Sequence, residues 1–321
     1  MSTGIRGAGA TPPPPSATPT PPATPPPAVA GARDRLGGLS PWLWIGPAVL
    51  VVAVFLLYPV LNTLWLSLFG DDSTSFVGLD NYARIFTDRS MLEVLRNNFL
   101  WLVLATAACV LLGLIIAVLV DRVRIESAAK AAIFIPMAIS FVGAGVIWKF
   151  MYQYAPKGQP QPGLLNALGT GLGLPPQAWL ISRGLNTFAL MVVYVWIWTG
   201  FCMVILSAAL KGIPTDVLEA ARVDGASELA IFFRVIVPMI SPTLAVVTTV
   251  MLVNVLKIFD IVYVMTGGNY GTNVVAVRYY QELFTNNRFG VASALAVLLL
   301  LAILPVMYVN VRRFRAQEAL R

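Results

Sequence analysis

Six apolar runs, each long enough to cross a lipid bilayer, constrain this chain more than any other feature of its sequence. A helix needs about 20 residues, at about 1.5 Å per residue, to cross about 30 Å of hydrocarbon. Lipid offers the backbone no hydrogen-bond partners, so a helix that satisfies its own backbone is expected for each run. The sequence therefore predicts an all-α, polytopic membrane protein with six transmembrane helices. The runs are Trp42–Phe69, Phe99–Val120, Ala131–Phe150, Leu185–Leu210, Thr243–Met265 and Phe289–Val311.

The scarcity of charged residues supports this prediction. Only 12% of the residues are charged and the mean hydropathy is +0.77, whereas soluble domains carry about 25% charged residues. A chain this poor in charge cannot cover a water-exposed surface. The net charge is +7, but the basic residues mostly flank the apolar runs and no basic patch is interleaved with aromatic residues. Membrane lipid is therefore the expected surrounding, and no nucleic-acid partner is expected.

The two ends of the chain differ from its middle. Residues 1–40 are mostly Pro, Ala and Thr and carry too little apolar bulk to fold, so a disordered, Pro-rich cytoplasmic tail is predicted. A proline-rich ligand for another protein is the alternative. A membrane domain over 41–315 and a short cytoplasmic tail over 316–321 follow. Lys and Arg are more frequent on the connections that are cytoplasmic when both termini are cytoplasmic, which sets the predicted orientation.

Several catalytic chemistries are excluded by what the sequence lacks. It contains no histidine, which removes the commonest general base and metal ligand. Cys109 and Cys202 lie within apolar runs and are expected to be small buried hydrophobic residues, with a redox or metal role as the alternative. No GxxxxGK[ST] phosphate loop occurs, so the chain itself is not expected to bind ATP. We therefore predict no enzyme activity, cofactor or metal in this chain.

The connection between the fourth and fifth runs is predicted to form two short helices around a tight bend. Thr215 or Asp216 is expected to cap the first helix, and Gly225 to end it in a left-handed conformation. Ser227 is expected to cap a second helix that runs to Pro238. Such a knob fits a groove in a partner protein. An amphipathic loop lying on lipid headgroups is the alternative.

Shorter signals lie in the other connections. The stretches DNYARIFTD and MLEVLRNN, which follow the first run, are expected to form short surface helices. The sequence TGGNYGTN after the fifth run indicates a turn. The prolines Pro47, Pro59 and Pro305 are expected to kink or bound their helices.

The bend carries a family resemblance. The sequence EAARVDGASELAIFFRVIVP resembles the EAA loop of ABC importer permeases, and its DGA form resembles the carbohydrate branch. The stretch FDIVYVMTGG at 259–268 and the layout of six helices are also similar to sugar permeases, and the resemblance covers about residues 42–315. Val235 and Val237 depart from the Ile and Leu of the general pattern. The residues that carry the loop resemblance are Glu219, Ala220, Ala221, Asp224, Gly225, Ala226, Phe232 and Pro238.

The resemblance implies a type I ABC importer permease fold in a bacterial cytoplasmic membrane. The loop at 211–238 would couple the chain to a dimeric cytoplasmic ATPase, which would bind the ATP and Mg. A second, homologous permease subunit would complete the pathway, and an extracytoplasmic solute-binding protein would deliver the solute. The chain would form half of the translocation pathway for a sugar or oligosaccharide, with an α-glucoside as the narrower expectation.

Polar residues inside lipid are costly and usually face a cavity or a partner. Lys257 and Asp260 have two interpretations, a structural ion pair or a surface that faces the sugar. The aromatic rings of the fourth run can stack on sugars or pack and anchor the helix. The candidate pathway residues are Tyr194, Trp198, Asn254, Lys257, Asp260 and Tyr263.

Other functional classes remain as alternatives. An ABC permease for a non-sugar solute differs only in its cargo. A secondary transporter or channel would need no ATPase, but the sequence shows no inverted repeats with interrupted helix pairs. A membrane enzyme would need a catalytic constellation, and none is visible.

Overall fold

The computed structural model describes residues 40–121 and 123–318, which form helices and turns with no extended strand among them. The chain divides into two units, residues 1–56 and 57–321. The first unit holds α1 (Ser40–Val52) and most of the π-helical turn that follows it. Nearly all of the predicted Pro-rich tail, and the end of the predicted C-terminal tail, lie outside the described residues.

The second unit contains the remaining α-helices. They are α2 (Tyr58–Leu66), α3 (Asp80–Thr87), α4 (Arg89–Leu100), α5 (Thr106–Val120), α6 (Glu126–Phe134), α7 (Phe141–Met151), α8 (Leu164–Gly171), α9 (Leu185–Lys211), α10 (Thr215–Val223), α11 (Glu228–Ile231), α12 (Val237–Leu256), α13 (Asp260–Thr266), α14 (Val275–Tyr280) and α15 (Phe289–Glu318).

Five helical stretches of the described chain are long and apolar enough to cross a membrane, and a bent pair makes a sixth span if it counts as one. The prediction of six spans agrees with the structure on that count. The bent pair is Glu126–Ala138 with Phe141–Met151, which meet at 99°. The five continuous stretches are Trp44–Leu66, Arg89–Val120, Leu185–Lys211, Glu228–Leu256 and Phe289–Tyr308.

The third span is broken rather than continuous as predicted. Pro136 lies in a 3₁₀ turn at Ile135–Ala138 that ends α6. Ser140 then adopts an extended conformation, and its hydroxyl accepts a hydrogen bond of 3.0 Å from the backbone of Gly143 at the start of α7. Because proline removes a backbone donor and serine caps a new helix, the apolar run contains a helix end and a helix start.

The fifth span lies earlier in the chain than the run Thr243–Met265 predicts. It begins at Glu228 and ends at Leu256, so α11 continues through a π-helical turn at Phe232–Ile236 into α12. The expectation that Pro238 ends the second loop helix is therefore wrong. Pro238 lies inside the continuous helical stretch, directly after the π-helical turn. Such a turn accommodates the residue that cannot donate a backbone hydrogen bond.

The other prolines and short signals have mixed outcomes. Pro59 lies at the start of α2, whereas Pro47 and Pro305 lie inside α1 and α15. The stretch DNYARIFTD forms α3 as predicted. The stretch MLEVLRNN is not a separate surface helix, because α4 continues through a π-helical turn into α5.

The core of the second unit lies where α5 packs on α9. Gly113 allows the closest approach, since a Cβ atom there would lie 2.5 Å from the Cβ of Cys202. Gly200 packs similarly against the backbone carbonyl of Ile133. Cys109 and Cys202 are both fully buried with free thiols. The prediction that they are small buried residues is confirmed.

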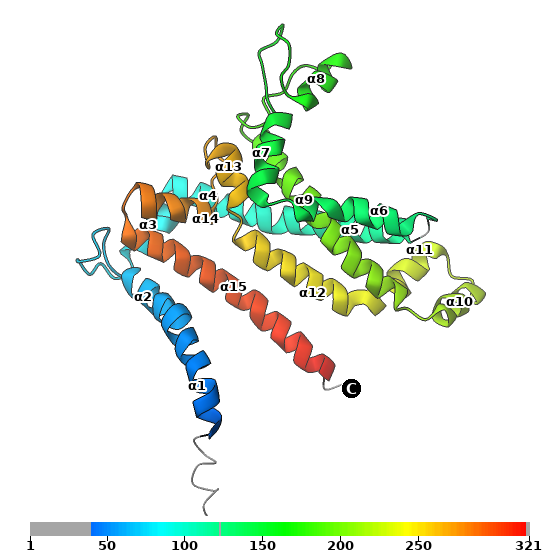
Figure 1. Ribbon diagram of the computed structural model, residues 1–321, viewed down its shortest axis with the longest axis horizontal. Coiled ribbons are helices and arrows are strands. Elements are labelled where there is room, and N and C mark those ends of the chain that lie inside the picture. The colour runs from blue at the N-terminus through cyan, green and yellow to red at the C-terminus, as the bar shows by residue number, and fades with distance from the viewer. Residues whose placement is uncertain (1–39, 122, 319–321) are drawn as a thin grey trace, which may run out of the picture. The chain divides into compact units, whose positions relative to one another are not determined.

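Within this unit, α10 and α11 lie at one end of the long helices, and α3 and α14 lie at the other end (Figure 1). Two connections therefore mark opposite ends of the bundle. We call residues 212–227, which contain α10, the α10 loop, and residues 267–288, which contain α14, the α14 loop.

Candidate functional site

The α10 loop makes a tight turn after its single α-helix. Gly225 has a φ of +80°, a conformation that favours glycine, and its N–H donates to the carbonyl of Arg222 at 3.0 Å. The N–H of Ala226 donates to the carbonyl of Ala221 at 3.1 Å, which completes a Schellman motif. Ser227 then caps α11 by accepting from the N–H of Ala230 at 3.3 Å. The predictions that Gly225 ends the first helix in a left-handed conformation and that Ser227 caps the second are confirmed.

The start of α10 differs from the prediction. Pro214 occupies the N-cap position, and no side chain caps this helix end. Neither Thr215 nor Asp216 is therefore the cap, because the helix already begins at Thr215. Proline preceding the first helical residue holds the extended conformation that the entry to the helix requires.

The α10 loop exposes its predicted contact residues. No residue of α10 is buried, and Val223 is 87% exposed. Among the eight residues that carry the family resemblance, Ala221, Ala226 and Phe232 are half-buried and the rest are exposed. Arg222 and Glu228 form an ion pair of 2.8 Å across the bend. The loop is thus a preformed bend that exposes Val217 and Val223, while Ile213 and Leu218 pack on the core.

A cluster of charges lies at the base of this loop. Lys130 contacts Asp121 at 2.7 Å and Glu126 at 2.6 Å. Lys211, the last residue of α9, also pairs with Glu126, and the hydroxyl of Ser207 donates to Asp121 at 2.6 Å. These contacts tie the end of α9, where the α10 loop begins, to the start of α6.

A small cavity lies where the bend of the third span and the end of the fifth span meet α9. Its volume is about 180 Å³. Phe141 comes from the start of α7, and Tyr194 and Trp198 come from α9. The remaining lining residues lie at the break after α12 and at the start of α13. They are Asn254, Lys257, Ile258, Phe259 and Asp260. Irregular backbone at membrane depth is tolerated where it lines a cavity, and such breaks form solute sites in transporters.

The structure brings five of the six predicted pathway residues to this one cavity. Tyr263 is the exception, because the helix ends at Leu256 and restarts at Asp260. The prediction of one continuous helix over Thr243–Met265 is therefore wrong. The sequence reasoning also missed Phe141, Ile258 and Phe259. Phe259 begins the stretch FDIVYVMTGG, and Pro136 followed by Ser140 was the available signal for a helix start at Phe141.

The side chains of the cavity keep free polar atoms. The structure shows no ion pair between Lys257 and Asp260 in the described part of the chain, so their structural pairing is not observed. The indole N–H of Trp198 and the hydroxyl of Tyr194 are buried without a hydrogen-bond partner among the described residues. A buried polar group without a partner costs free energy, which a polar solute would recover.

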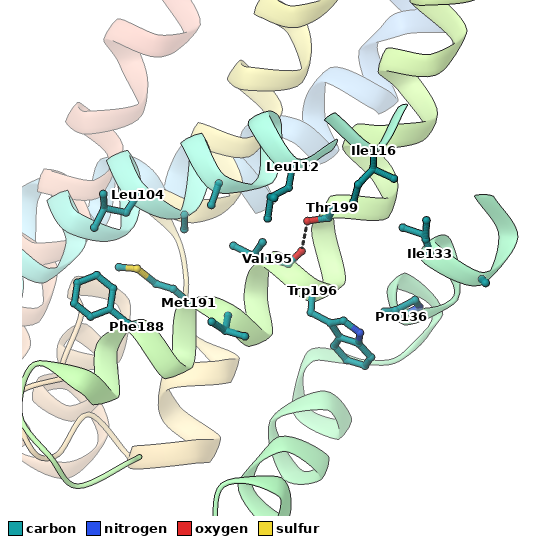
Figure 2. Close-up of a pocket in the computed structure, with 14 residues that line it drawn as sticks. Leu104, Leu112, Ile116, Ile133, Pro136, Phe188, Met191, Val195, Trp196 and Thr199 are labelled. Carbon is teal, nitrogen blue, oxygen red and sulfur yellow. Dashed lines mark hydrogen bonds between the residues drawn. The ribbon is translucent and has the colours of Figure 1, made fainter. Parts of the chain in front are cut away.

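A second, larger cavity differs in chemistry. It has a volume of about 680 Å³ and lies between α5, α9 and the end of α6. Figure 2 shows Leu104, in the π-helical turn before α5, and Leu112 and Ile116 of α5 opposite Phe188 and other apolar residues of α9. Thr199 lines it too, but its hydroxyl already donates to the carbonyl of Val195 at 2.6 Å. This cavity suits apolar groups and offers little to a polyhydroxy solute.

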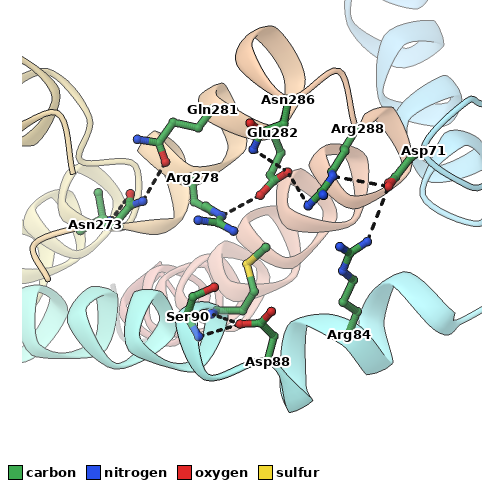
Figure 3. A network of polar contacts seen from close by, with 12 residues as sticks. Asp71, Arg84, Asp88, Ser90, Asn273, Arg278, Gln281, Glu282, Asn286 and Arg288 are labelled. Atoms are coloured by element: carbon green, nitrogen blue, oxygen red, sulfur yellow. Dashed lines mark hydrogen bonds and ion pairs between the residues drawn. The ribbon is translucent and has the colours of Figure 1, made fainter. Parts of the chain in front are cut away.

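The α14 loop is held by a charged network at the opposite end (Figure 3). Glu282 is fully buried and pairs with Arg278 at 2.8 Å and with Arg288 at 3.8 Å. Asp71 contacts both Arg288 and Arg84 at 3.6 Å. The network joins the connection after α2, helix α3 and the α14 loop.

Amide side chains of α4 hold the same loop. Asn97 donates to the carbonyls of Gly271 at 2.7 Å and Asn273 at 2.9 Å. Gly271 and the two glycines before it in TGGNYGTN have positive φ, so the predicted turn is confirmed. Asp88 caps α4 by accepting from the N–H of Ser90 at 2.7 Å, and the hydrogen bonds from Ser90 lower the pKa of this carboxyl.

Asn98 satisfies backbone groups at the end of the fifth span and at the start of α14. Its amide nitrogen donates to the carbonyl of Leu256 at 3.3 Å, and its oxygen accepts from the N–H of Val275 at 3.0 Å. The carbonyl at the end of α12 and the first N–H of α14 would otherwise be buried without partners. A single side chain of α4 thus satisfies the backbone beside the small cavity.

Known proteins resemble this chain along most of its length. It is 58% identical over 279 residues to the osmoprotective compounds uptake permease protein GgtC of Synechocystis sp., with 87% of this chain and 100% of that protein covered. It is 47% identical to the alpha-glucoside transport system permease protein AglF of Rhizobium meliloti, with 89% and 85% covered.

The fold also matches a solved structure. A bacterial ABC transporter involved in the import of the acidic polysaccharide alginate has a chain that superposes with a TM-score of 0.73 at 20% identity, covering 87% of this chain and 99% of that one. The sequence matches the family described as "Binding-protein-dependent transport system inner membrane component" over residues 109–316. This chain therefore belongs to the family of inner-membrane components of binding-protein-dependent transport systems.

Proposed function

We propose that this chain forms half of the translocation pathway of an ATP-driven importer for a sugar, with α-glucosides as the narrower class. The observation that carries the proposal is the cavity of about 180 Å³ at the two helix breaks. It combines the charged and amide groups of Asn254, Lys257 and Asp260 with the rings of Tyr194 and Trp198. Sugars need both, because hydroxyl groups require hydrogen-bond partners and pyranose faces are apolar.

The size of the cavity supports a shared site. Ligand pockets usually enclose about 300–1,000 Å³, and this cavity is smaller. A second, homologous permease subunit would add the opposite wall. The resulting site would lie between two subunits, where broken helices of transporters commonly hold their solutes.

The relatives support two classes of solute. One is named an alpha-glucoside permease, which favours a sugar. The relative with 58% identity is named for osmoprotective compounds, a class that includes sugars and non-sugars, so a non-sugar osmoprotectant is the second candidate. The cavity itself favours the sugar, because aromatic faces beside neutral and charged hydrogen-bonding groups suit a pyranoside.

The α10 loop is the proposed contact with the ATPase. The coupling surface, within the predicted loop 211–238, would combine six residues of the α10 loop with two residues that follow it: Glu219, Ala220, Ala221, Asp224, Gly225 and Ala226, then Phe232 and Pro238. Its exposed knob would dock in a dimeric cytoplasmic ATPase, which would bind ATP and Mg in place of this chain. Both termini would then be cytoplasmic, and the α14 loop would face an extracytoplasmic solute-binding protein.

Purification and reconstitution test the proposal. The tagged chain, expressed with its chromosomal partners and purified in mild detergent, should carry an ATPase and a second permease, identified by mass spectrometry. In proteoliposomes with the solute-binding protein, uptake of radiolabelled trehalose should require ATP. Uptake by this chain alone, without an ATPase, would instead establish a secondary transporter. ATP-dependent uptake of glycine betaine but not of trehalose would assign the second class of solute.

A pair of matched substitutions tests the cavity. Trp198→Leu removes a ring from the small cavity and should lower trehalose uptake about tenfold, which corresponds to about 1.4 kcal/mol. Trp196→Leu makes the same change on the same helix but at the larger apolar cavity, and it should leave uptake within about threefold. Equal losses in the two variants would remove the small cavity from the pathway.

A further inference from the structure

The rings of the small cavity continue into a series of aromatic side chains outside it. Phe259 lines the cavity and stacks on Tyr263 of α13, with 5.0 Å between ring centroids and 15° between planes. Tyr280 of α14 lies 5.5 Å from Phe259 and 5.1 Å from Tyr263. Phe284 follows at 4.9 Å from Tyr280. Four rings therefore form an unbroken series from the cavity through α13 and the α14 loop.

The exposure of these rings separates them from an ordinary aromatic core. Tyr263 is 40% exposed and Phe284 is 63% exposed, whereas Trp101 in the core of the bundle is fully buried. Rings that serve only to pack are expected to be covered by other side chains of the same chain. Here, aromatic surface remains accessible at successive positions along the series.

The backbone beneath the rings is held firmly. Gln281 lies between Tyr280 and Phe284, and its amide donates to the carbonyl of Gly267 at 2.9 Å and accepts from Asn273 at 2.8 Å. Glu282 is buried in the charged network described above. The series of rings is therefore presented by a fixed scaffold, so its spacing is a property of the fold.

We propose that Phe284, Tyr280, Tyr263 and Phe259 form an aromatic track that passes pyranoside rings between the solute-binding protein and the cavity. Each contact stacks an apolar pyranose face on an aromatic face. Such a contact is weak and tolerant of hydroxyl configuration, so a sugar can move from ring to ring. The inference rests on the proposed sugar-import function and adds a route into its site.

If the track is correct, sugar uptake depends on the aromatic ring of Tyr263 and not on its hydroxyl group. In the reconstituted complex, Tyr263→Leu should raise the trehalose KM for binding-protein-dependent uptake by roughly tenfold, as expected for one lost aromatic contact. Tyr263→Phe keeps the ring and should behave like the wild type. Phe284→Leu should lower uptake in the same way, whereas Phe289→Leu, an exposed ring outside the series, should have little effect.

The outcomes distinguish the track from the function beneath it. If the wild type imports trehalose with ATP but Tyr263→Leu does so equally well, the track is wrong and the import function stands. The track is also wrong if Tyr263→Phe is as defective as Tyr263→Leu. If the second permease no longer co-purifies with Tyr263→Leu, the rings form a subunit interface and the track is wrong. A wild-type complex that imports only non-sugar solutes overturns both proposals.

Discussion

The α10 loop and the α14 loop join transmembrane helices at opposite ends of the same bundle, yet they are held in different ways. The α14 loop is fixed by buried amides of α4 and by the fully buried Glu282. The α10 loop keeps its bend through its own backbone, and α10 buries none of its residues. One loop is part of the folded core, whereas the other holds a shape that leaves its surface available to another protein.

The largest expected effect comes from the bend of the α10 loop. Gly225→Trp should lower ATP-dependent uptake by about 100-fold or more, because a bulky ring and a strained positive φ would both oppose docking. The six spans should still insert, since a Cβ atom at Gly225 would meet no heavy atom within 4 Å. Uptake in proteoliposomes measures the loss of transport, and co-purification of the ATPase measures the loss of docking.

Gly173 provides a matched control. It has a φ of +79°, close to the +80° of Gly225, and equally open space around it. It lies in the connection between α7 and α9, which the proposed orientation places outside the cell. Gly173→Trp should therefore transport like the wild type. Normal uptake and ATPase recruitment by Gly225→Trp would show that the bend is not the coupling surface.

In the α14 loop, Glu282→Ala should mainly reduce stability. It leaves the largely buried Arg278 without its counter-charge, while Arg288 keeps its contact with Asp71, and breaking a buried ion pair typically costs about 3–5 kcal/mol. The midpoint temperature of thermal unfolding in detergent should fall clearly. Fluorescence-detected gel filtration of heated samples measures it. Glu93→Ala removes an exposed pair of 3.9 Å with Arg96 and should cost less than about 1 kcal/mol. Equal midpoints for the two variants would contradict the structural role of Glu282.

Asn98→Leu should have an intermediate effect on the same measurement. It would leave the carbonyl of Leu256 and the N–H of Val275 without partners, at a cost of about 1–3 kcal/mol. Asn269→Leu, at an exposed position in the α14 loop, is the control and should change the midpoint less. A stable Asn98→Leu variant would mean that the break after α12 does not depend on this side chain.

Arg222→Ala should have the smallest effect. The ion pair with Glu228 is exposed, so salt screens it and it contributes less than about 1 kcal/mol. The Schellman hydrogen bonds should hold the bend without it, and uptake should stay within about twofold of the wild type. A large loss of uptake would show that Arg222 contributes to docking as well as to the bend.

Local sequence signals predicted the parts of the molecule that depend on neighbouring residues. Apolar length located the first, second, fourth and sixth membrane spans, because a helix that crosses lipid needs a long apolar run. Gly225 and Ser227 were identified correctly, since a left-handed turn and a helix cap each depend on a few adjacent residues. The burial of Cys109 and Cys202 followed from their apolar surroundings.

Only the tertiary structure decided where the third span bends, where the helix is interrupted after the fifth span, and which residues line the cavity. Apolar length gives no sign of a break after Leu256, because the freed backbone is satisfied by Asn98, far away in the sequence. Because of this interruption, Asp260 lines the cavity and Tyr263 does not. The bend after Pro136 places Phe141 at the same cavity. A periodic pattern assumes an uninterrupted helix, whereas long-range hydrogen bonds determine where a helix can be interrupted.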